Sequence, residues 1–277
     1  MASRWGPRVD VRPLLGHEQD ALLAYLRSLS ADQWDVVTAA APWRVRDVTA
    51  HVLGDHLGRL SRSRDREPPP VRAPGEGLGP FLHHFNAQWV AATARMSTWV
   101  LLELLGDVGP RVVDHWQRLD LDGLGEPVSW ASPEPAPAWL DAARDYTECW
   151  VHQQQIREAT GGGLFAAPRF FAPVLDTFAR ALPLTLRHLA GRFRDTQVTL
   201  VVTGDSGGTW TVRSDGWRWL FNDAPARPGA MSVRVGEDSF WRLCVRSLSP
   251  ERAHEAVEGD ADPAVLDAVR SMTAIIV

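Results

Sequence analysis

The sequence predicts an α+β protein in two parts: an N-terminal up-and-down four-helix bundle over residues 1–163 and a smaller α+β domain over residues 164–277. Three observations predict this arrangement. Apolar residues recur at helical spacing through the first 160 residues, alternation of period two begins only after residue 196, and three glycines at 161–163 separate the two patterns. We therefore expect the domain boundary close to these glycines.

Four segments carry the helical pattern of the first part. The first two are expected over residues 11–30 and 45–64, and a loop rich in Pro and Gly follows at 67–80. The third covers residues 81–119, either as one long helix or as two helices split around residues 106–110. The fourth covers residues 141–160, after the Pro-rich segment 132–137 and before the three glycines. Four long helices joined in this way predict an up-and-down bundle.

The second part combines helices with a sheet that we expect to be antiparallel. One helix is predicted over residues 170–189, and two further helices are predicted near the C-terminus, at 238–247 and 262–272. The alternating segments predict strands at 197–203, 209–213, 217–221 and 230–235, with a short strand near 255–258.

Composition excludes several classes of protein. The net charge of −5 gives no electrostatic case for binding nucleic acid or an anionic membrane. The only cysteines, Cys149 and Cys244, argue against a secreted disulfide framework. The N-terminal segment MASRWGPRVD has no apolar run of the signal-peptide type. We therefore expect a cytoplasmic protein, monomeric or homodimeric, that acts on small molecules.

The helix expected over residues 141–160 carries Glu148 and His152, four residues apart and hence on one helix face. Such a pair can bind one divalent metal ion, although an isolated pair is more often an ordinary polar contact on a solvated face. His51, midway along the second predicted helix, is a third candidate ligand, and a bundle brings side chains of different helices together. His51 alone could equally be a hydrogen-bonded core histidine.

Two aspartates flank His51 at a spacing of four residues. Asp47 and Asp55 lie on the same predicted helix face as His51. They could hold the ring of His51 by hydrogen bonds from behind a metal site. Alternatively, they pair locally with Arg44, Arg46 or Arg59.

The segments PWRVRDVTAHVLGDH (42–56) and YTECWVHQQQIREA (146–159) resemble the two signatures of the DinB-like metalloproteins. They are most similar to the branch named after mycothiol-dependent maleylpyruvate isomerase. The resemblance implies that His51, Glu148 and His152 bind a divalent metal, usually Zn²⁺. It extends to the C-terminal part, where VEGDADPAVLDAV (257–269) resembles the closing motif of a sterol-carrier-like domain.

This resemblance implies the chemistry as well. A coordinated thiol is held as a thiolate, which is the nucleophile for attack on an electrophilic carbon. The thiol implied is mycothiol. Arg246 occupies a place where this C-terminal domain often carries an arginine, which either binds a substrate carboxylate or faces water.

We therefore expect a metal-dependent, mycothiol-using transferase or isomerase that acts on an electrophilic small molecule, in detoxification or in natural-product sulfur incorporation. Two alternatives stay open. One is a non-catalytic small-molecule or lipid-binding protein with a structural metal. The other is a metal-dependent hydrolase, for which Asp55 is the candidate general base.

The string GDSGG at residues 204–208 matches the active-site sequence of serine proteases, but its context does not. It lies between two alternating segments, where Gly and Asp favour a hairpin turn. We therefore predict a turn there and no serine-protease site.

Overall fold

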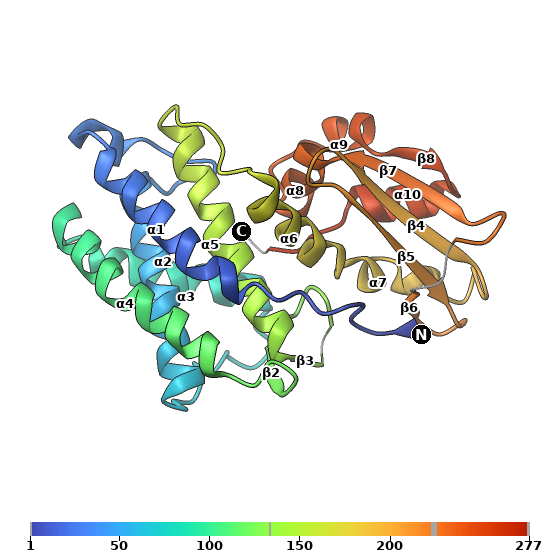
Figure 1. Ribbon diagram of the computed structural model, residues 1–277, viewed down its shortest axis with the longest axis horizontal. Helices are drawn as coiled ribbons and strands as arrows, with labels where there is room; N and C mark the ends of the chain where they lie inside the picture. The colour runs from blue at the N-terminus through green and yellow to red at the C-terminus, as the bar shows by residue number, and fades with distance from the viewer. Residues whose placement is uncertain (1, 133, 223–225, 276–277) are drawn as a thin grey trace. The chain divides into compact units, whose positions relative to one another are not determined.

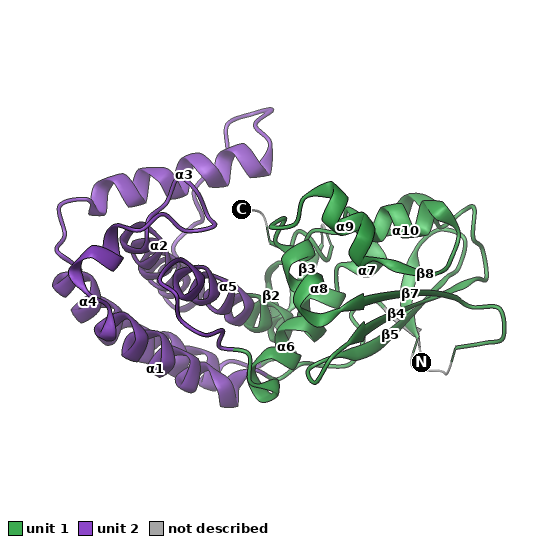
Figure 2. Cartoon of the chain, turned by 90° about the horizontal axis from the view of Figure 1, so that it is seen from above, with its two compact units in different colours: residues 1–10, 121–144, 166–276 green, residues 11–120, 145–165, 277 purple. Residues whose placement is uncertain are grey.

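The computed structural model describes residues 2–132, 134–222 and 226–275, which form two compact units (Figure 2). Unit 2 holds the described residues of 11–120 and 145–165, and unit 1 holds those of 1–10, 121–144 and 166–276. The predicted domain ranges also include residues 1, 133, 223–225, 276 and 277, which lie outside the described residues. The domain boundary after residue 163 remains a proposal.

Helices build unit 2 (Figure 1). Helices α1 and α2 both pack against α4, and α3 packs against α2. Helix α5 contacts α1 through Gln19 and Cys149, and it contacts α2 through the rings of His51 and His152. The helices are α1 (Arg12–Ser28), α2 (Val45–Arg59, continued by a π-helical turn at Leu60–Arg64), α3 (Leu78–Thr93), α4 (Thr98–Arg118) and α5 (Ala138–Ala159), whose first turns belong to unit 1.

The third predicted helix is two helices, and the split predicted around residues 106–110 is wrong. The break falls at residues 94–97, where the side chain of Ser97 accepts a hydrogen bond from the Val100 N–H and so caps α4. Pro110 lies inside α4. A stripe of buried side chains at helical spacing continues past Pro110, and its packing outweighs the destabilising effect of the proline on the helix. The stripe consists of Leu101, Leu105, Val108, Val112 and Trp116.

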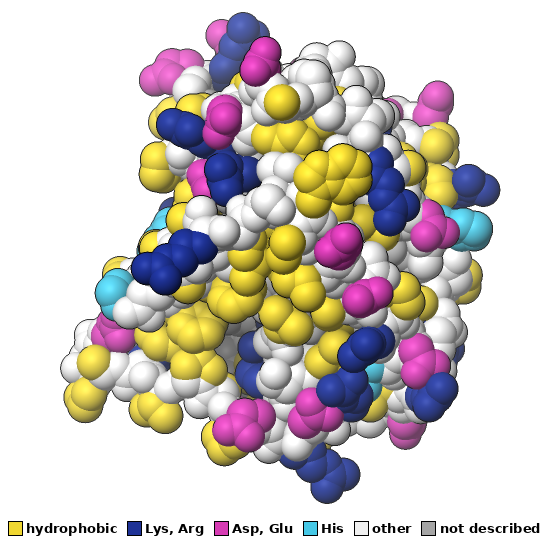
Figure 3. All heavy atoms as spheres, turned by 90° about the vertical axis from the view of Figure 1, so that its left-hand side faces the viewer, with side chains coloured by type: hydrophobic (Ala, Val, Ile, Leu, Met, Phe, Trp, Pro, Cys, Tyr) yellow, Lys and Arg dark blue, Asp and Glu magenta, His cyan; other side chains and the backbone are white. Residues whose placement is uncertain are grey.

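Helix α3 covers the outside of the unit. Of the side chains on this helix, which the structure describes in full, that of Thr93 alone is buried. Phe85 on α3 and Trp99 on α4 are large exposed apolar residues. Figure 3 shows one face of the molecule, on which acidic and basic side chains surround apolar ones. No helix in the described ranges is long and apolar enough to cross a membrane.

Unit 1 contains a sheet of six strands among the residues described, in the order β1-β6-β5-β4-β7-β8. Strand β4 is antiparallel to β5 but parallel to β7, so the predicted all-antiparallel sheet is wrong. The chain leaves β6 on one side of the β4–β5 hairpin and enters β7 on the other side, and alternation of side chains does not reveal such a crossover. The strands are β1 (Ala2–Ser3), β4 (Gln197–Thr203), β5 (Gly208–Ser214), β6 (Trp219–Asn222), β7 (Met231–Gly236) and β8 (Glu258–Asp260).

Short helices complete unit 1. The single helix predicted over residues 170–189 is wrong, because the chain forms α6 (Pro168–Ala179), α7 (Leu182–Thr185) and a 3₁₀ turn (Arg187–Leu189). Pro183 lies in the first turn of α7, where it starts a new helix but cannot continue the preceding one. Helix α9 (Pro250–Ala256) was not predicted. The remaining elements are α8 (Glu237–Cys244), α10 (Pro263–Arg270) and a small two-stranded sheet of β2 (Leu124–Pro127) and β3 (Pro135–Pro137).

The turn predicted at residues 204–208 is confirmed. Strands β4 and β5 pair in an antiparallel hairpin, with Val202 opposite Gly208. Gly204 has a φ of 133°, which a residue with a side chain rarely adopts. The GDSGG segment therefore forms the turn of a β-hairpin.

Candidate metal centre

Four side chains from two helices of unit 2 meet at one point. His51 and Asp55 come from α2, and Glu148 and His152 come from α5. One ligand atom of each lies within 4.8 Å of the others. The three residues predicted as metal ligands are thus brought together, and Asp55 joins them.

The distances within the cluster are those of groups that face a common centre. His51 Nε2 lies 3.3 Å from Asp55 Oδ2 and 3.9 Å from Glu148 Oε1, and His152 Nε2 lies 3.3 Å from Glu148 Oε1. The two imidazole rings stand edge to face, with centroids 4.7 Å apart. Both histidines are buried, at 4% and 3% exposure, while the two carboxylates are partly accessible. A ligand can therefore reach the cluster from the carboxylate side.

Helix geometry explains why these four residues meet. On each helix the two ligands are four residues apart, so they project from one face. Val45, Val48 and Val52 of α2 are fully buried or nearly so and seat this helix in the bundle. The sequence signal was therefore the repeated spacing of four on both helices.

Asp47 lies one turn before His51. Its carboxylate accepts a hydrogen bond from the Arg44 N–H at 2.9 Å and caps the start of α2. This contact is the local pairing that was the alternative to a role beside His51. Asp55, by contrast, contacts His51 itself.

Two further residues, neither predicted from the sequence, contact the rings of the histidines and hold them in place. Gln155 Oε1 lies 2.8 Å from His152 Nδ1 and is buried at 3% exposure. An amide oxygen accepts, so Nδ1 carries a proton and Nε2 is the ring nitrogen directed into the cluster. The ring of Trp43 packs on that of His51, with centroids 4.9 Å apart. In sequence terms, Gln155 was detectable as the i+3 neighbour of His152.

We expect Gln155→Leu to weaken metal binding about 10- to 100-fold, the usual cost of removing a partner that orients a histidine ligand. The variant keeps the volume of the side chain but removes the acceptor for Nδ1–H. Competition with a chelating dye measures the dissociation constant for Zn²⁺. Gln154→Leu is the matched control, because this buried neighbour bonds the Phe165 N–H and the Trp150 carbonyl and is not one of the four residues of the cluster. Equal affinities in wild type and Gln155→Leu would show that Gln155 does not set the tautomer.

Burial and charge act in opposite directions on the cluster. Burial lowers the pKa of His51, but Asp55 and Glu148 together outweigh it, so that the pKa of His51 is raised. Burial would raise the pKa of Glu148, but contacts with His152 and His51 hold it well below its usual range. Burial raises the pKa of Asp55. Glu148 is therefore a carboxylate at neutral pH.

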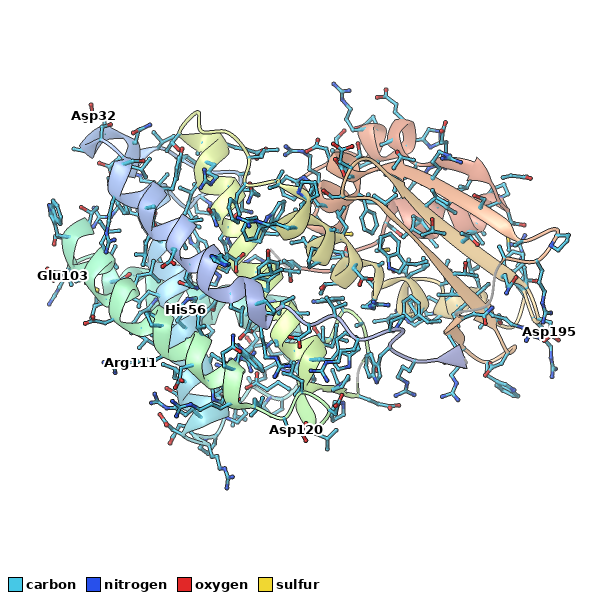
Figure 4. All side chains as sticks on the ribbon, viewed as in Figure 1. Asp32, His56, Glu103, Arg111, Asp120 and Asp195 are labelled. Carbon is cyan, nitrogen blue, oxygen red and sulfur yellow. The ribbon has the colours of Figure 1, made fainter. Side chains whose placement is uncertain are left out.

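His56, labelled in Figure 4, follows Asp55 on α2 but is not one of the four residues that converge in the cluster. Its Nε2 lies 2.5 Å from Gln19 Nε2, inside the bundle. Burial lowers the pKa of His56 to about 4, so that the imidazole is neutral. It is a core histidine that completes the packing of α2 against α1.

The donor set fits a divalent metal ion. Two imidazole nitrogens and two carboxylate oxygens suit Zn²⁺, and they also suit Fe²⁺ or Mn²⁺. The four atoms already face one centre, and the hydrogen bond from Nδ1 of His152 to Gln155 leaves Nε2 as the nitrogen for the metal. A cation among them would also offset the repulsion between the carboxylates of Asp55 and Glu148.

Comparison with known proteins shows the family of the chain. The family model described as the mycothiol maleylpyruvate isomerase N-terminal domain matches residues 15–157. The chain belongs to this family. No curated protein sequence matches it at a significant level.

Two solved structures share the fold of this mycothiol maleylpyruvate isomerase family member. One is the mycothiol-dependent maleylpyruvate isomerase, with a TM-score of 0.54, and the other is a histidine-to-alanine mutant of that enzyme, with a TM-score of 0.53. Each is 12% identical in sequence, and each match covers 91% of this chain and 93% of the other. The likeness therefore extends over both units of the chain.

The family match includes all four residues of the cluster but not Arg246. Arg246 belongs to unit 1, just after α8, where it is exposed and its Nε donates to Thr273 Oγ1 at 3.1 Å. It has a φ of 56°, in the left-handed region that few residues with side chains adopt. Its role toward a substrate remains a prediction.

Proposed function

We propose that this chain is a metal-dependent enzyme that uses mycothiol to transform an electrophilic small molecule, as an isomerase or a thiol transferase. The observation that carries the proposal is the convergence of His51, Asp55, Glu148 and His152 in a chain of the mycothiol maleylpyruvate isomerase family. We propose Zn²⁺ as the metal, because imidazole nitrogen and carboxylate oxygen are the ligands of catalytic zinc sites and the family resemblance implies this ion.

The four residues have distinct tasks in this proposal. His51, Glu148 and His152 would hold the ion, with Asp55 beside them as a fourth group that binds the ion or accepts a proton from the incoming thiol. When bound, the ion supplies a Lewis acid that lowers the pKa of a coordinated thiol. Trp43 and Gln155 hold the two imidazoles in place, so that the nitrogens need no reorganisation.

The substrate side of the proposal concerns Arg246 and the electrophile. The two solved structures are of an enzyme named for maleylpyruvate, so this compound is the first electrophile to test. We propose that Arg246 binds a substrate carboxylate, as a guanidinium can do through two parallel hydrogen bonds. Arg246→Gln should then raise KM with little change in kcat.

The deciding experiment measures the metal content of the purified protein and of His51→Ala, followed by titration with mycothiol. We expect about one equivalent of metal in the wild type, its loss in the variant, and release of a proton when mycothiol binds, since the thiol must deprotonate to coordinate. A protein that takes up no metal after incubation with Zn²⁺ contradicts the proposal. A protein that binds metal but ignores mycothiol would favour a structural metal instead.

A further inference from the structure

An ion pair between a buried arginine and a partly buried aspartate lies one helical turn from the metal cluster. Arg59 Nε donates to Asp145 Oδ2 at 2.6 Å, and Arg59 Nη2 donates to Asp145 Oδ1 at 2.6 Å. The Arg59 side chain is 2% exposed and that of Asp145 is 23% exposed. Two parallel charge-assisted hydrogen bonds fix both the distance and the relative orientation of the two side chains.

Trp116 joins the pair from a third helix. Its Nε1 donates to Asp145 Oδ2 at 3.2 Å, and its ring centroid lies 4.9 Å from the guanidinium carbon of Arg59. Trp116 is fully buried. Helices α2, α4 and α5 are therefore tied at one point, which we call the Arg59–Asp145–Trp116 clamp.

The position of the clamp relates it to the ligands. Arg59 lies four residues after Asp55 on α2, and Asp145 lies three residues before Glu148 on α5. Residues three or four apart are adjacent on a helix surface. The clamp thus joins α2 and α5 one turn away from the point where the same two helices present their ligands. Because a helical turn is stiff, a slide of one helix at the clamp shifts its ligands by a similar distance.

Stability alone does not explain this pair. Desolvation of a buried ion pair largely offsets its attraction, and an apolar pair of similar volume is often as stable. Specification of the register between two helices is the better attested function of such groups. A guanidinium group can form two parallel hydrogen bonds with a carboxylate in only one alignment of the two helices, whereas apolar side chains can pack in several alignments.

We infer that Arg59 and Asp145 are positioning residues that set the register of α2 against α5 and thereby the geometry of the His51–Asp55–Glu148–His152 metal site. This inference rests on the proposed function. It assigns to the clamp an effect on metal affinity and coordination that exceeds its effect on stability.

The test compares wild type with the double variant Arg59→Met/Asp145→Leu. We expect the double variant to fold with a similar Tm but to bind Zn²⁺ about 10- to 100-fold more weakly, as when orienting partners of ligands are lost. The visible absorption spectrum of the Co²⁺-loaded protein should also change, because its bands report the geometry around the ion and not the stability of the fold. Arg59→Lys keeps the positive charge but cannot form the two parallel hydrogen bonds of the guanidinium group, and we expect about a tenfold loss of Zn²⁺ affinity.

Unit 1 supplies a matched control. Arg180, whose side chain is 1% exposed, donates to Asp176 Oδ1 at 2.7 Å, and Trp210 Nε1 donates to the same oxygen at 2.6 Å. Arg180→Met/Asp176→Leu therefore removes a buried arginine and its aspartate partner in unit 1, where the aspartate lies one turn before the arginine and so ties no two helices together. Its Zn²⁺ affinity and Co²⁺ spectrum should match those of the wild type.

The outcomes separate this inference from the proposed function. Failure of the wild type to bind metal overturns both. Binding by the wild type with an unchanged affinity and Co²⁺ spectrum in the double variant overturns the inference alone. If the double variant does not fold, Arg59→Lys decides, and wild-type affinity with an unchanged spectrum in that variant overturns the inference.

Discussion

His152→Ala is expected to lower mycothiol-dependent turnover by about three powers of ten and to weaken Zn²⁺ binding more than about 100-fold. A metal ion acting as a Lewis acid contributes several kcal/mol of transition-state stabilisation, and each 1.36 kcal/mol is a factor of ten in rate. Loss of a ligand must also cost more affinity than the 10- to 100-fold typical of a residue that only orients one. His152 has both features of a ligand, an Nε2 that lies 3.3 Å from Glu148 Oε1 within the cluster and an Nδ1 held by Gln155.

The measurement combines metal titration with turnover under saturating mycothiol, and circular dichroism checks that the helices remain. His188→Ala is the control, because this exposed histidine belongs to unit 1 and lies outside the cluster. Its metal affinity and turnover should equal those of the wild type. Full turnover by a folded His152→Ala protein would rule out the proposed metal site as the catalytic centre.

The cluster was predictable in part because its ligands repeat a local rule. A spacing of four on each of two helices places side chains on one face, and this is visible in the sequence. Which of the two aspartates joins His51 depends on where α2 begins. Asp47 falls in the first turn of α2, where its carboxylate accepts a hydrogen bond from the Arg44 N–H, whereas Asp55 lies one turn after His51 and contacts its ring.

Other features depend on contacts between distant parts of the chain and leave no local signal. Arg59 and Asp145 are 86 residues apart, and nothing in the spacing within either helix identifies them as partners. The parallel pairing of β4 with β7 likewise follows from the path of the chain between strands, since alternation of side chains is the same in either direction. The break predicted around residues 106–110 was wrong because a proline usually ends a helix, whereas here the packing of the buried stripe of α4 outweighs the effect of Pro110.

A second large effect concerns Glu18, a carboxyl group on α1 that is 1% exposed. Its Oε1 has no hydrogen-bond partner among the described residues. Burial raises the pKa of Glu18 well above its usual range, and a hydrogen bond with Cys149 opposes this only in part. Glu18 therefore keeps its proton in the folded protein at pH values where the unfolded chain, with a pKa of about 4.3, has lost it.

Folding stability must then fall as pH rises. Between the two pKa values the folded state binds one more proton than the unfolded state, so each pH unit removes up to about 1.4 kcal/mol of stability. Glu18→Gln abolishes this titration with almost no change in shape. We expect the variant to match the wild type near pH 4 and to become progressively more stable than the wild type from pH 5 to pH 8.

Urea denaturation of both proteins at each pH measures the difference in the free energy of unfolding. Glu103→Gln is the control, because it makes the same substitution at a glutamate that stands exposed on α4 (Figure 4). A Glu18→Gln difference that stays constant from pH 5 to pH 8 would mean that Glu18 ionises in the folded bundle as readily as in the unfolded chain. The interior between α1 and α5 would then have to admit water or a counter-charge. A growing difference would instead show that this interior stays dry.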